Sequence, residues 1–436
     1  MNKLNALFAF DRHGTTVGRE VIAGLTTFTT MSYIVVVNPA ILSAAGIPEG
    51  PSFVATVLTA VFGCYFMAFY ANRPFAIAPY MGENAFIAFT VCKVLGFHWQ
   101  TALAAIFIAG AAFIVMTVLH LRQWIVDGVP TVLRYSFAVG IGLFLTFIGL
   151  NETGLVKLGI PGAPVQAGNL TSHPSLVAMF GFVLIAILII RKIPGAILLG
   201  IVVTALVAFL ARTAVPPHSI VSMPPSIAPI VWQLDFRGAL TWRAFPVVLT
   251  MFIMAFVDTM GTLIGVSARA GFLDENGQLP QIERPMLVDA VATTIAPALG
   301  TTTAGAYIES ATGVEAGGRT GFTVLIAGTC FLLTLIFSPF VAAIPPQAFG
   351  PALIIVGLFM LAPITHIDFG DYTESIPAFA VVVLMAFTFN IANGICAGFV
   401  LYPICKIVAG KVSQLKPGLW VLTGISLLFF IFYPYG

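Results

Sequence analysis

The sequence contains little charge. Of its 436 residues only 8% are Asp, Glu, Lys or Arg, whereas 59% are hydrophobic, and the mean hydropathy is +1.02. A soluble domain carries roughly a quarter charged residues because its surface faces water. So few charges do not cover a water-facing surface of this size. Most of the surface must therefore face lipid.

Several chemical motifs are also missing. The five cysteines show no CxxC spacing, the six histidines have no ligand partner at helical spacing, and HExxH is absent. These absences argue against a metal site and a zinc-type intramembrane protease, and no motif of paired aspartates supports an aspartyl protease. No basic run indicates a nucleic-acid partner. We therefore expect neither a metal, a cofactor nor an enzymatic activity.

Long apolar stretches dominate the chain. A membrane-crossing helix needs about 20 mostly apolar residues. Such stretches occur at 18–45, 51–72, 99–120, 130–150, 174–191, 193–213, 244–268, 285–299, 321–344, 348–363, 375–390 and 391–410. Two more, 74–95 and 300–319, are interrupted by Gly, Pro and acids, and with them the sequence predicts about fourteen crossings. A last apolar stretch, 418–434, has no assigned place.

The basic residues predict the orientation. Cytoplasmic loops of membrane proteins carry an excess of Lys and Arg. With a cytoplasmic N-terminus and fourteen alternating spans, fourteen of the 19 basic residues lie inside. The remaining five lie outside: Lys93, Lys157, Arg212, Arg237 and Arg243. The number of spans and the orientation support each other.

The two interrupted stretches are the most informative. They read PFAIAPYMGENAFIAFTV at 74–91 and GTTTAGAYIESATGVEAGGRTG at 300–321. Irregular backbone at membrane depth survives only where protein or a water-filled cavity satisfies its polar groups. One such segment in each half of the chain, running in opposite directions, is typical of the binding site of an inverted-repeat transporter. The alternative, ordinary loops between helices, would spoil the charge alternation.

Acidic residues inside the apolar stretches are candidate site residues, because a charge at the bilayer centre is costly. Asp258 stands alone in its stretch, and Thr262 lies one helical turn later on the same face. Gly261 and Gly265 form a GxxxG step, which permits the close approach of another helix. The alternative for Asp258 is a structural carboxylate bonded to neighbouring backbone.

Three further polar residues lie at the interrupted stretches. Glu309 suits a helix cap, a ligand group or both, and the amide of Asn84 suits the edge of a heterocycle. Glu83 either faces the site or points outward. Burial favours the protonated form of a carboxyl group, so Asp258 or Glu309 is expected to bind a proton and thereby to couple transport to protons.

Other polar residues are expected to be structural. Near the predicted cytoplasmic ends of the spans, interfacial pairing is expected for Asp289, Glu315, Arg319 and Glu374. Asn390 and Asn393 lie at a helix break, which they are expected to stabilise rather than bind solute.

Several longer motifs carry a family resemblance. They are GLTTFTTMSYIVVVNPAIL, APYMGENAF, FVDTMGTLIGVSARAGFLDENG, AYIESATGVEAGGRTG, PALIIVGLFML and ESIPAF, and together they span essentially the whole chain. With them the chain resembles purine permeases of the azaguanine/adenine type. This group is a branch of the nucleobase–cation and nucleobase–ascorbate symporter superfamily.

The resemblance implies an all-α polytopic fold. It has fourteen spans in a seven-plus-seven inverted repeat, in which two discontinuous spans each combine a short strand with a half-helix. A core domain, 1–120 and 244–344, would move against a gate domain, 121–243 and 345–436, within a homodimer. The implied location is the bacterial inner membrane.

The resemblance also implies proton-coupled import of adenine, guanine or hypoxanthine. Asp258 and Glu309 match the family's base-binding acids, Asn84 its essential amide and Tyr307 the position beside the second acid, while Thr29 is a weaker match. Three positions depart from relatives: Glu83 stands where many have Leu, Thr262 where the uracil branch has His, and Asn393 where an Asp is common.

Two other transport functions stay open at this point. An anion carrier of the sulfate-permease type shares the architecture, but two acids buried in the membrane would repel an anion. A passive channel would differ in that its flux would neither saturate nor follow the proton gradient.

Overall fold

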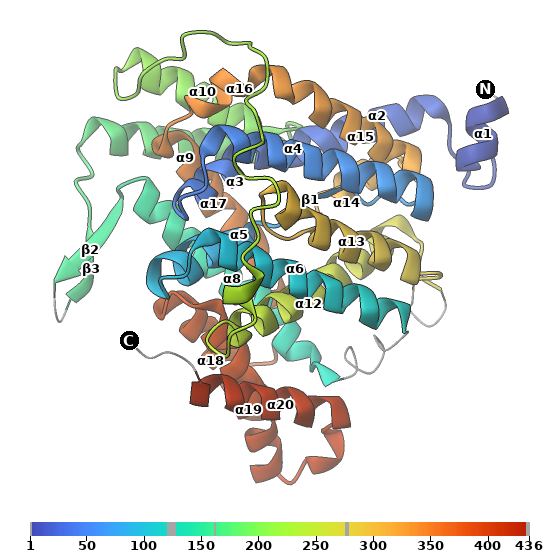
Figure 1. Cartoon of the computed structure of the whole chain (residues 1–436), viewed down its shortest axis with the longest axis vertical. Helices are drawn as coiled ribbons and strands as arrows, with labels where there is room; N and C mark the ends of the chain where they lie inside the picture. The colour runs from blue at the N-terminus through green and yellow to red at the C-terminus, as the bar shows by residue number, and fades with distance from the viewer. Residues whose placement is uncertain (1, 120–127, 161–162, 275–278, 433–436) are drawn as a thin grey trace.

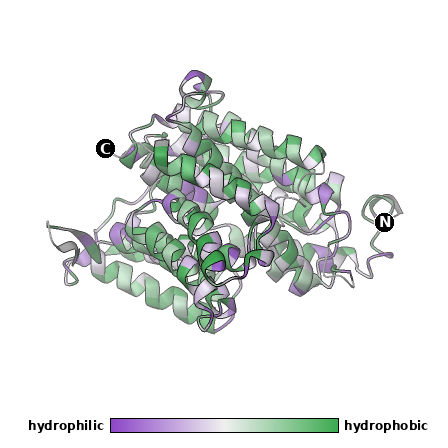
Figure 2. Ribbon diagram, turned by 90° about the horizontal axis from the view of Figure 1, so that it is seen from below, coloured by the Kyte–Doolittle hydropathy of each residue, from purple (hydrophilic) through white to green (hydrophobic). Residues whose placement is uncertain are grey.

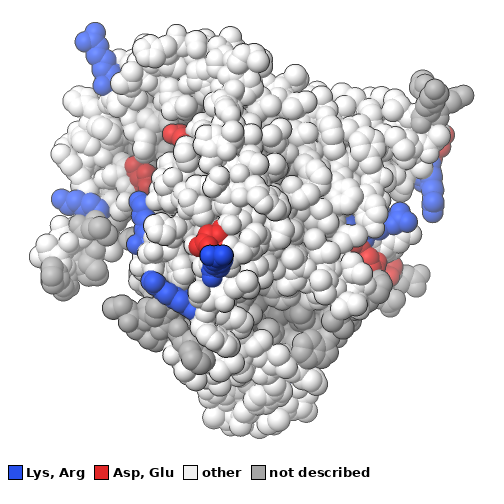
Figure 3. All heavy atoms as spheres, in the orientation of Figure 1, with Lys and Arg blue, Asp and Glu red and all other residues white. Residues whose placement is uncertain are grey.

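The computed structural model describes residues 2–119, 128–160, 163–274 and 279–432. Most of the long helices run side by side along one direction, from left to right in Figure 1. Hydrophobic residues cover these helices, and hydrophilic residues concentrate in the loops and at the helix ends (Figure 2). In Figure 3 the charged side chains form two groups, at the left and the right, with a broad uncharged band between them. This distribution fits helices that cross a bilayer.

The first half of the chain contains one interrupted span and one surface hairpin. Its elements are α1 (Asn2–Phe8), α2 (Val17–Met31), α3 (Ile34–Ser43), α4 (Glu49–Phe66), the π-helical η1 (Met67–Ala71), β1 (Ile77–Pro79), α5 (Met81–Ala85), the π-helical η2 (Phe86–Val94), α6 (Trp99–Val118), α8 (Thr131–Glu152), the hairpin β2 (Val156–Ile160) and β3 (Ala163–Ala167), α9 (His173–Ile190), α10 (Ala196–Leu210) and the short α11 (Phe236–Ala239).

The second half repeats this order without the hairpin. Its elements are α12 (Phe245–Ala270), α13 (Glu283–Leu299), β4 (Ala304–Ala306), α14 (Ser310–Glu315), α15 (Gly321–Thr334), the 3-10 turn η3 (Leu335–Phe337), α16 (Ser338–Ala342), α17 (Pro346–Met360), η4 (Ala362–His366), α18 (Tyr372–Phe387), α19 (Ile391–Val408), η5 (Val412–Gln414) and α20 (Pro417–Phe432).

The predicted spans are confirmed. Within the described residues nine helices are long and apolar enough to cross a membrane, and α10, α18 and α20 are shorter apolar helices. Helix α13 and the two segments containing β1 and β4 account for the rest of the fourteen predicted crossings. Helix α20 is additional to these crossings. The predicted stretch 418–434 corresponds to α20, which packs on α19, where the Thr423 hydroxyl donates to the Phe399 carbonyl at 2.8 Å.

One predicted span is not a single helix. The stretch 18–45 was expected to be continuous, but α2 ends at Met31 and α3 begins at Ile34. Ser32 and Tyr33 form the break, and the Ser32 hydroxyl donates to the Thr29 carbonyl at 3.3 Å. A hydroxyl that bonds to the preceding turn competes with regular helical bonding, which accounts for a bend here. The break directs Tyr33 toward the second half of the chain.

A short two-stranded ladder joins the two halves. Strands β1 and β4 are antiparallel, with Ala78 paired to Gly305 at the centre. Beyond the strands, the N–H of Tyr80 donates to the Thr303 carbonyl at 3.0 Å and that of Tyr307 to the Ala76 carbonyl at 2.9 Å. The ladder is therefore symmetric about the Ala78–Gly305 pair. The two interrupted segments run in opposite directions, as the inverted repeat requires.

The helix pairs follow the same symmetry. Helix α2 packs on α15 as α12 packs on α6, and α8 packs on α18 as α17 packs on α9. Helices α8 and α17, one from each half, pack against each other. Of the domain boundaries expected from the resemblance, 243/244 and 344/345 fall immediately before α12 and α17, and 120/121 lies outside the described residues.

Candidate functional site

The first interrupted segment is extended because its sequence prevents a helix. Pro74 and Pro79 lack the N–H group that a continuous helix needs. The N–H of Ile77 donates instead to the Cys64 sulfur at 3.4 Å, and β1 pairs with β4. Helix α5 then begins at Met81, deep inside the protein, where Glu83 and Asn84 have no exposed surface.

The second interrupted segment is held in place by Asp289, whose position differs from the one expected from the sequence. Asp289 on α13 was expected at an interface, but it is fully buried. Its carboxylate accepts the Ala306 N–H at 2.8 Å and the Tyr80 hydroxyl at 3.4 Å. A Cβ at position 305 would lie 2.2 Å from that hydroxyl and 2.4 Å from the carboxylate, so only glycine fits there. Asp289 therefore holds the strand crossing.

Glu309 lies directly before α14 and keeps some accessible surface. The hydroxyl of Tyr33, at the break between α2 and α3, donates to its Oε1 at 2.7 Å. Nearby, the Thr30 and Thr312 hydroxyls lie 3.0 Å apart. A carboxylate that accepts from a neutral hydroxyl is stabilised in its charged form. Sequence reasoning missed Tyr33, although it lies one helical turn after the threonine pair Thr29–Thr30.

Asp258 lies in the middle of α12 and is surrounded by protein, yet it keeps partial exposure, as does Thr262 one turn later. No described helix makes the close approach that the GxxxG step permits. A Cβ at Gly261 would meet no atom within 4 Å, and at Gly265 it would meet only Ile308, in ordinary contact at 3.4 Å. The two glycines therefore leave this face of α12 open beside Asp258 instead of receiving a helix.

Glu83 points toward Asp258. Its side chain has no exposed surface, and neither carboxyl oxygen accepts a hydrogen bond from a hydroxyl, amide or cation of the described residues. The carboxyl of Asp258 lies beside it and that of Asp289 acts on it from the next helix. Glu83, which the sequence left undecided, thus faces inward.

Asn84 belongs to a buried polar network. Its amide nitrogen donates to the Asn38 side chain, and its oxygen accepts from the Thr302 hydroxyl. Asn38 in turn donates to Thr56 at 2.7 Å and to Thr301 at 2.9 Å. The network links α3, α4 and the approach to β4, so it fixes the crossing of the two segments.

Tyr307 and Tyr80 occupy matching positions after the two strands. Their rings are parallel, with centroids 6.2 Å apart. The Tyr307 hydroxyl donates to the Pro79 carbonyl, so it ties the second segment to the first. Thr29 lies elsewhere: its hydroxyl donates to the Thr26 carbonyl at 2.9 Å, and its Cβ would lie 3.2 Å from a Cβ on Gly195, at the start of α10.

The comparisons with known proteins agree with this arrangement. The model of the Permease family matches residues 18–397. The chain belongs to the Permease family.

Relatives of this permease match it over nearly its full length. It is 40% identical to the adenine permease AdeP of Escherichia coli, over 98% of this chain and 96% of that one. It is 37% identical to the guanine/hypoxanthine permease PbuG of Bacillus subtilis, over 98% of this chain and 100% of that one. These relatives are transporters and not enzymes.

The fold of the permease also matches a solved structure. The transmembrane domain of the cyanobacterial bicarbonate transporter BicA superposes with a TM-score of 0.62, at 17% identity, over 88% of this chain and 97% of that one. The fold is therefore a mostly helical inverted repeat, shared with that transmembrane domain. At this identity the likeness concerns the fold alone.

The remaining polar residues of the permease are structural. Glu315 pairs with Arg269 at 3.0 Å and Glu374 with Lys406 at 3.1 Å, as expected for interfacial acids. Arg319 has a different role from the one expected, because its guanidinium donates to the Val314 and Gly318 carbonyls. Both asparagines at the helix break behave as predicted: Asn390 caps α19, and the Asn393 amide donates to the Thr388 hydroxyl at 3.2 Å.

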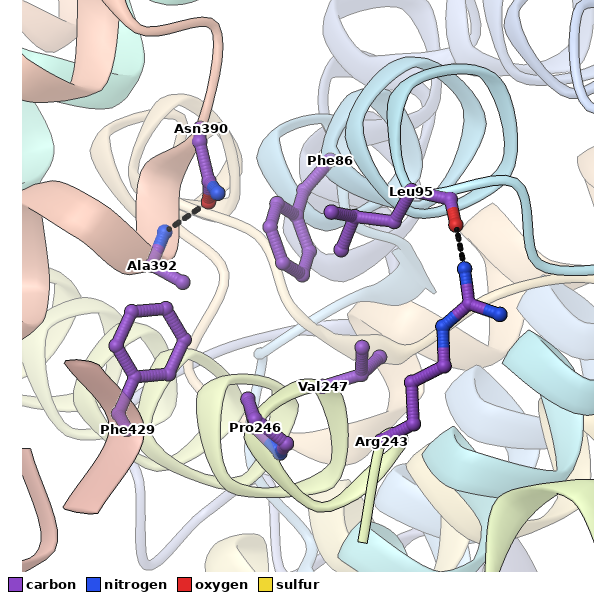
Figure 4. A pocket seen from close by; sticks show the side chains of 8 residues that line it. All are labelled: Phe86, Leu95, Arg243, Pro246, Val247, Asn390, Ala392 and Phe429. Atoms are coloured by element: carbon purple, nitrogen blue, oxygen red, sulfur yellow. Dashed lines mark hydrogen bonds between the residues drawn. The ribbon is translucent and has the colours of Figure 1, made fainter. Parts of the chain in front are cut away.

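A small cavity lies apart from the acids. It has a volume of about 10 Å³, between η2, the start of α12 and the helices α19 and α20. Figure 4 shows Phe86 and Phe429 beside it, and Arg243, whose guanidinium donates to the Leu95 carbonyl at 2.8 Å. This volume holds about one water molecule and no organic solute.

Proposed function

We propose that this permease imports purine nucleobases, adenine, guanine or hypoxanthine, together with protons. The observation that carries the proposal is the presence of two carboxyl groups at partly exposed positions, Asp258 in the middle of α12 and Glu309 directly before the half-helix α14. The names of AdeP and PbuG, which specify adenine and guanine/hypoxanthine, support the same substrate class.

The chemistry of the base suits these groups. Every purine presents ring and exocyclic N–H donors, and a carboxylate is a strong acceptor for N–H groups. Asp258 and Glu309 would accept from the base, Thr262 would donate or accept at its edge, and Tyr307 would form one wall. Asn84 would act through the buried network, by fixing the half-helices that carry Glu309 and Glu83.

The helix packing supports a movement between two units. Under our proposal, the core comprises 1–120 and 244–344, and it carries both acids. The gate comprises 121–243 and 345–436, and α8 and α17 form its centre. Rocking of the core against the gate would open the site to one side at a time. The excess of basic residues in alternate loops supports a cytoplasmic N-terminus in the inner membrane.

The anion-carrier alternative gains nothing from the acids. BicA shares the fold, but an anion would meet Asp258 and Glu309 without a described Lys or Arg paired to either of them. Burying like charges together is costly. A base with N–H donors would instead be stabilised.

Uptake of labelled bases tests the proposal. The permease is expressed in cells that lack their own purine uptake, and labelled adenine and hypoxanthine are offered with a panel of unlabelled purines, with and without a protonophore. We expect saturable accumulation that purines inhibit competitively and that the protonophore abolishes. Uptake equal to that of cells without the permease, for adenine, guanine and hypoxanthine alike, would overturn it.

A further inference from the structure

The first half-helix carries a carboxyl group that the binding of a base does not require. Glu83 is fully buried, whereas Asp258 beside it keeps accessible surface. The two belong to different segments, α5 and α12, which contact each other. A buried carboxylate without a hydrogen-bond donor or a cation is strongly unfavourable. Glu83 therefore needs a proton, and Asp258 is the acceptor that this proton meets.

We propose that Glu83 and Asp258 form a proton-sharing pair, in which Glu83 stores the proton that is transported with the base. This proposal rests on the proposed function, which it deepens by naming the proton store. In the loaded state the Glu83 O–H donates to the Asp258 carboxylate, and the second oxygen of Asp258 accepts an N–H of the base.

The transfer follows from the difference in exposure. Asp258 keeps accessible surface and Glu83 has none, so in the proposed cycle a proton from water first binds an oxygen of Asp258. The O–H bond on Asp258 then breaks while one forms on Glu83, which restores the Asp258 carboxylate for the base. After the base leaves on the other side, the proton returns to Asp258 and passes to water. Protons and charge balance, because one proton enters and the same number leaves per cycle.

The surroundings of Glu83 contain no competing partner. Helix α12 presents Asp258, Asp289 lies on the neighbouring α13, and the phenols of Tyr80 and Tyr307 are the other titratable groups that interact with Glu83 or lie next to it. Of the elements packed on α5, α3 has no titratable residue. On α8, Arg134 donates to the Val129 carbonyl, and on η2, Lys93 lies over the Phe89 ring. No described cation neutralises the pair.

The substitution Glu83→Gln tests the pair, because the glutamine amide permanently imitates protonated Glu83 as a donor to Asp258. Base counterflow is measured in vesicles at equal pH on both sides, from pH 5.5 to 8.5. Above its midpoint a one-proton requirement reduces the rate about tenfold per pH unit. We expect the wild type to lose at least about tenfold across this range, and Glu83→Gln to change less than about twofold and to accumulate no base against a gradient.

A matched control is Glu315→Gln, which removes an exposed acid outside the site. It should keep the pH profile of the wild type. A Glu83→Gln profile identical to that of the wild type would overturn the proton-sharing pair while leaving purine transport intact. Absence of counterflow in the wild type would contradict the proposed function itself.

A second measurement does not depend on folding of the variant. Dicyclohexylcarbodiimide adds to protonated carboxyl groups in apolar surroundings, and mass spectrometry of the digested wild-type protein locates the adduct. We expect an adduct at Glu83 or Asp258 that forms at pH 6 and decreases at least about fivefold at pH 9. An unmodified pair at both pH values, with modification of Glu309 only, would contradict the proposal.

Discussion

The two half-helices differ by one residue in the position of their acid. Both follow a three-residue strand and a tyrosine, Tyr80 or Tyr307. Glu309 is the second residue after its tyrosine, and Glu83 is the third after its own. One residue on a helix turns a side chain by about 100°. Glu309 consequently keeps exposed surface and meets a hydroxyl, whereas Glu83 turns inward and meets carboxyl groups.

This difference assigns two roles to two similar residues. Glu309 keeps accessible surface and accepts a hydrogen bond from the Tyr33 hydroxyl, which suits the binding of N–H groups. Glu83 is fully buried and neither of its carboxyl oxygens has a hydrogen-bond partner among the described residues, which suits the storage of a proton. An inverted repeat thus provides equivalent scaffolds, and a shift of one position gives them different chemistry.

The largest effect is expected when either of the two acids proposed to bind the base is removed. Asp258→Ala and Glu309→Ala should each reduce uptake of labelled adenine and hypoxanthine at least about 100-fold, because each removes a buried charge-assisted hydrogen bond and leaves its partners unpaired. Protein amounts in the membrane, measured by immunoblot, should equal those of the wild type. Unchanged uptake in both variants would refute the assignment of the base contacts.

The next two substitutions compare the acids of the two half-helices, Glu309 and Glu83, directly. Glu309→Gln should weaken apparent base affinity about 10–100-fold while the pH profile of counterflow keeps its shape, since the proton store is intact. Glu83→Gln should do the opposite and flatten the profile. KM and pH profiles measured in the same vesicles separate the two effects. If both variants flattened the pH profile equally, Glu309 and Glu83 would not have distinct roles.

A smaller effect is expected from the supporting hydroxyl. Tyr33→Phe removes the donor to Glu309 and should raise KM about tenfold, which corresponds to about 1.4 kcal/mol for one hydrogen bond to a charged group. Tyr65→Phe, on the Tyr65–Thr329 contact at the surface, is the matched control and should leave KM unchanged.

The network at Asn84 should affect stability. Asn84→Ala leaves Asn38 and Thr302 without their partners in the interior and should lower the free energy of unfolding by about 2 kcal/mol. Thermal unfolding in detergent measures this loss, and Asn151→Ala, at an exposed position, serves as the control. A specific loss of affinity at unchanged stability would show that Asn84 contacts the base.

The smallest effect concerns Asp371, which lies outside the spans at the start of α18. The Lys411 ammonium and the hydroxyl and N–H of Thr373 lower its pKa. Because the pKa is lower in the folded state, the stabilisation is present above the unfolded value of about 3.9 and is lost as pH falls through the folded value. Asp371→Asn should lower Tm by about 2 °C at pH 7. The difference from the wild type should shrink progressively below about pH 4, and a difference independent of pH would contradict this account.

The sequence predicted the architecture well, because membrane spans depend on local composition. The ends of the long spans follow from apolar length, and the interrupted segments from Pro79, Gly305 and their neighbours. The break at Ser32–Tyr33 escaped prediction, since its apolar pattern continues through it. A hydroxyl that bonds to the preceding turn leaves no trace in the pattern.

The details of the site were less predictable, because they depend on which way a side chain turns. Asp289 lies near a span end in sequence, yet its helix packs so that the acid meets the N–H of Ala306. Asn84 had the right chemistry for a base, but Asn38 and Thr302 occupy its amide. The GxxxG step at Gly261 permits a close neighbour, but no described atom comes within 4 Å of a Cβ placed there. Sequence spacing gives the face of a helix, and only the packing gives the partner on that face.

The symmetric ladder has a consequence for the origin of the fold. Because the register is symmetric about the Ala78–Gly305 pair, the same strand from two identical half-length chains, inserted in opposite orientations, would pair with itself. An ancestral homodimer could therefore close the same crossing before gene duplication fused its halves. Glu83 and Glu309 would then have diverged later without a change in the backbone that carries them.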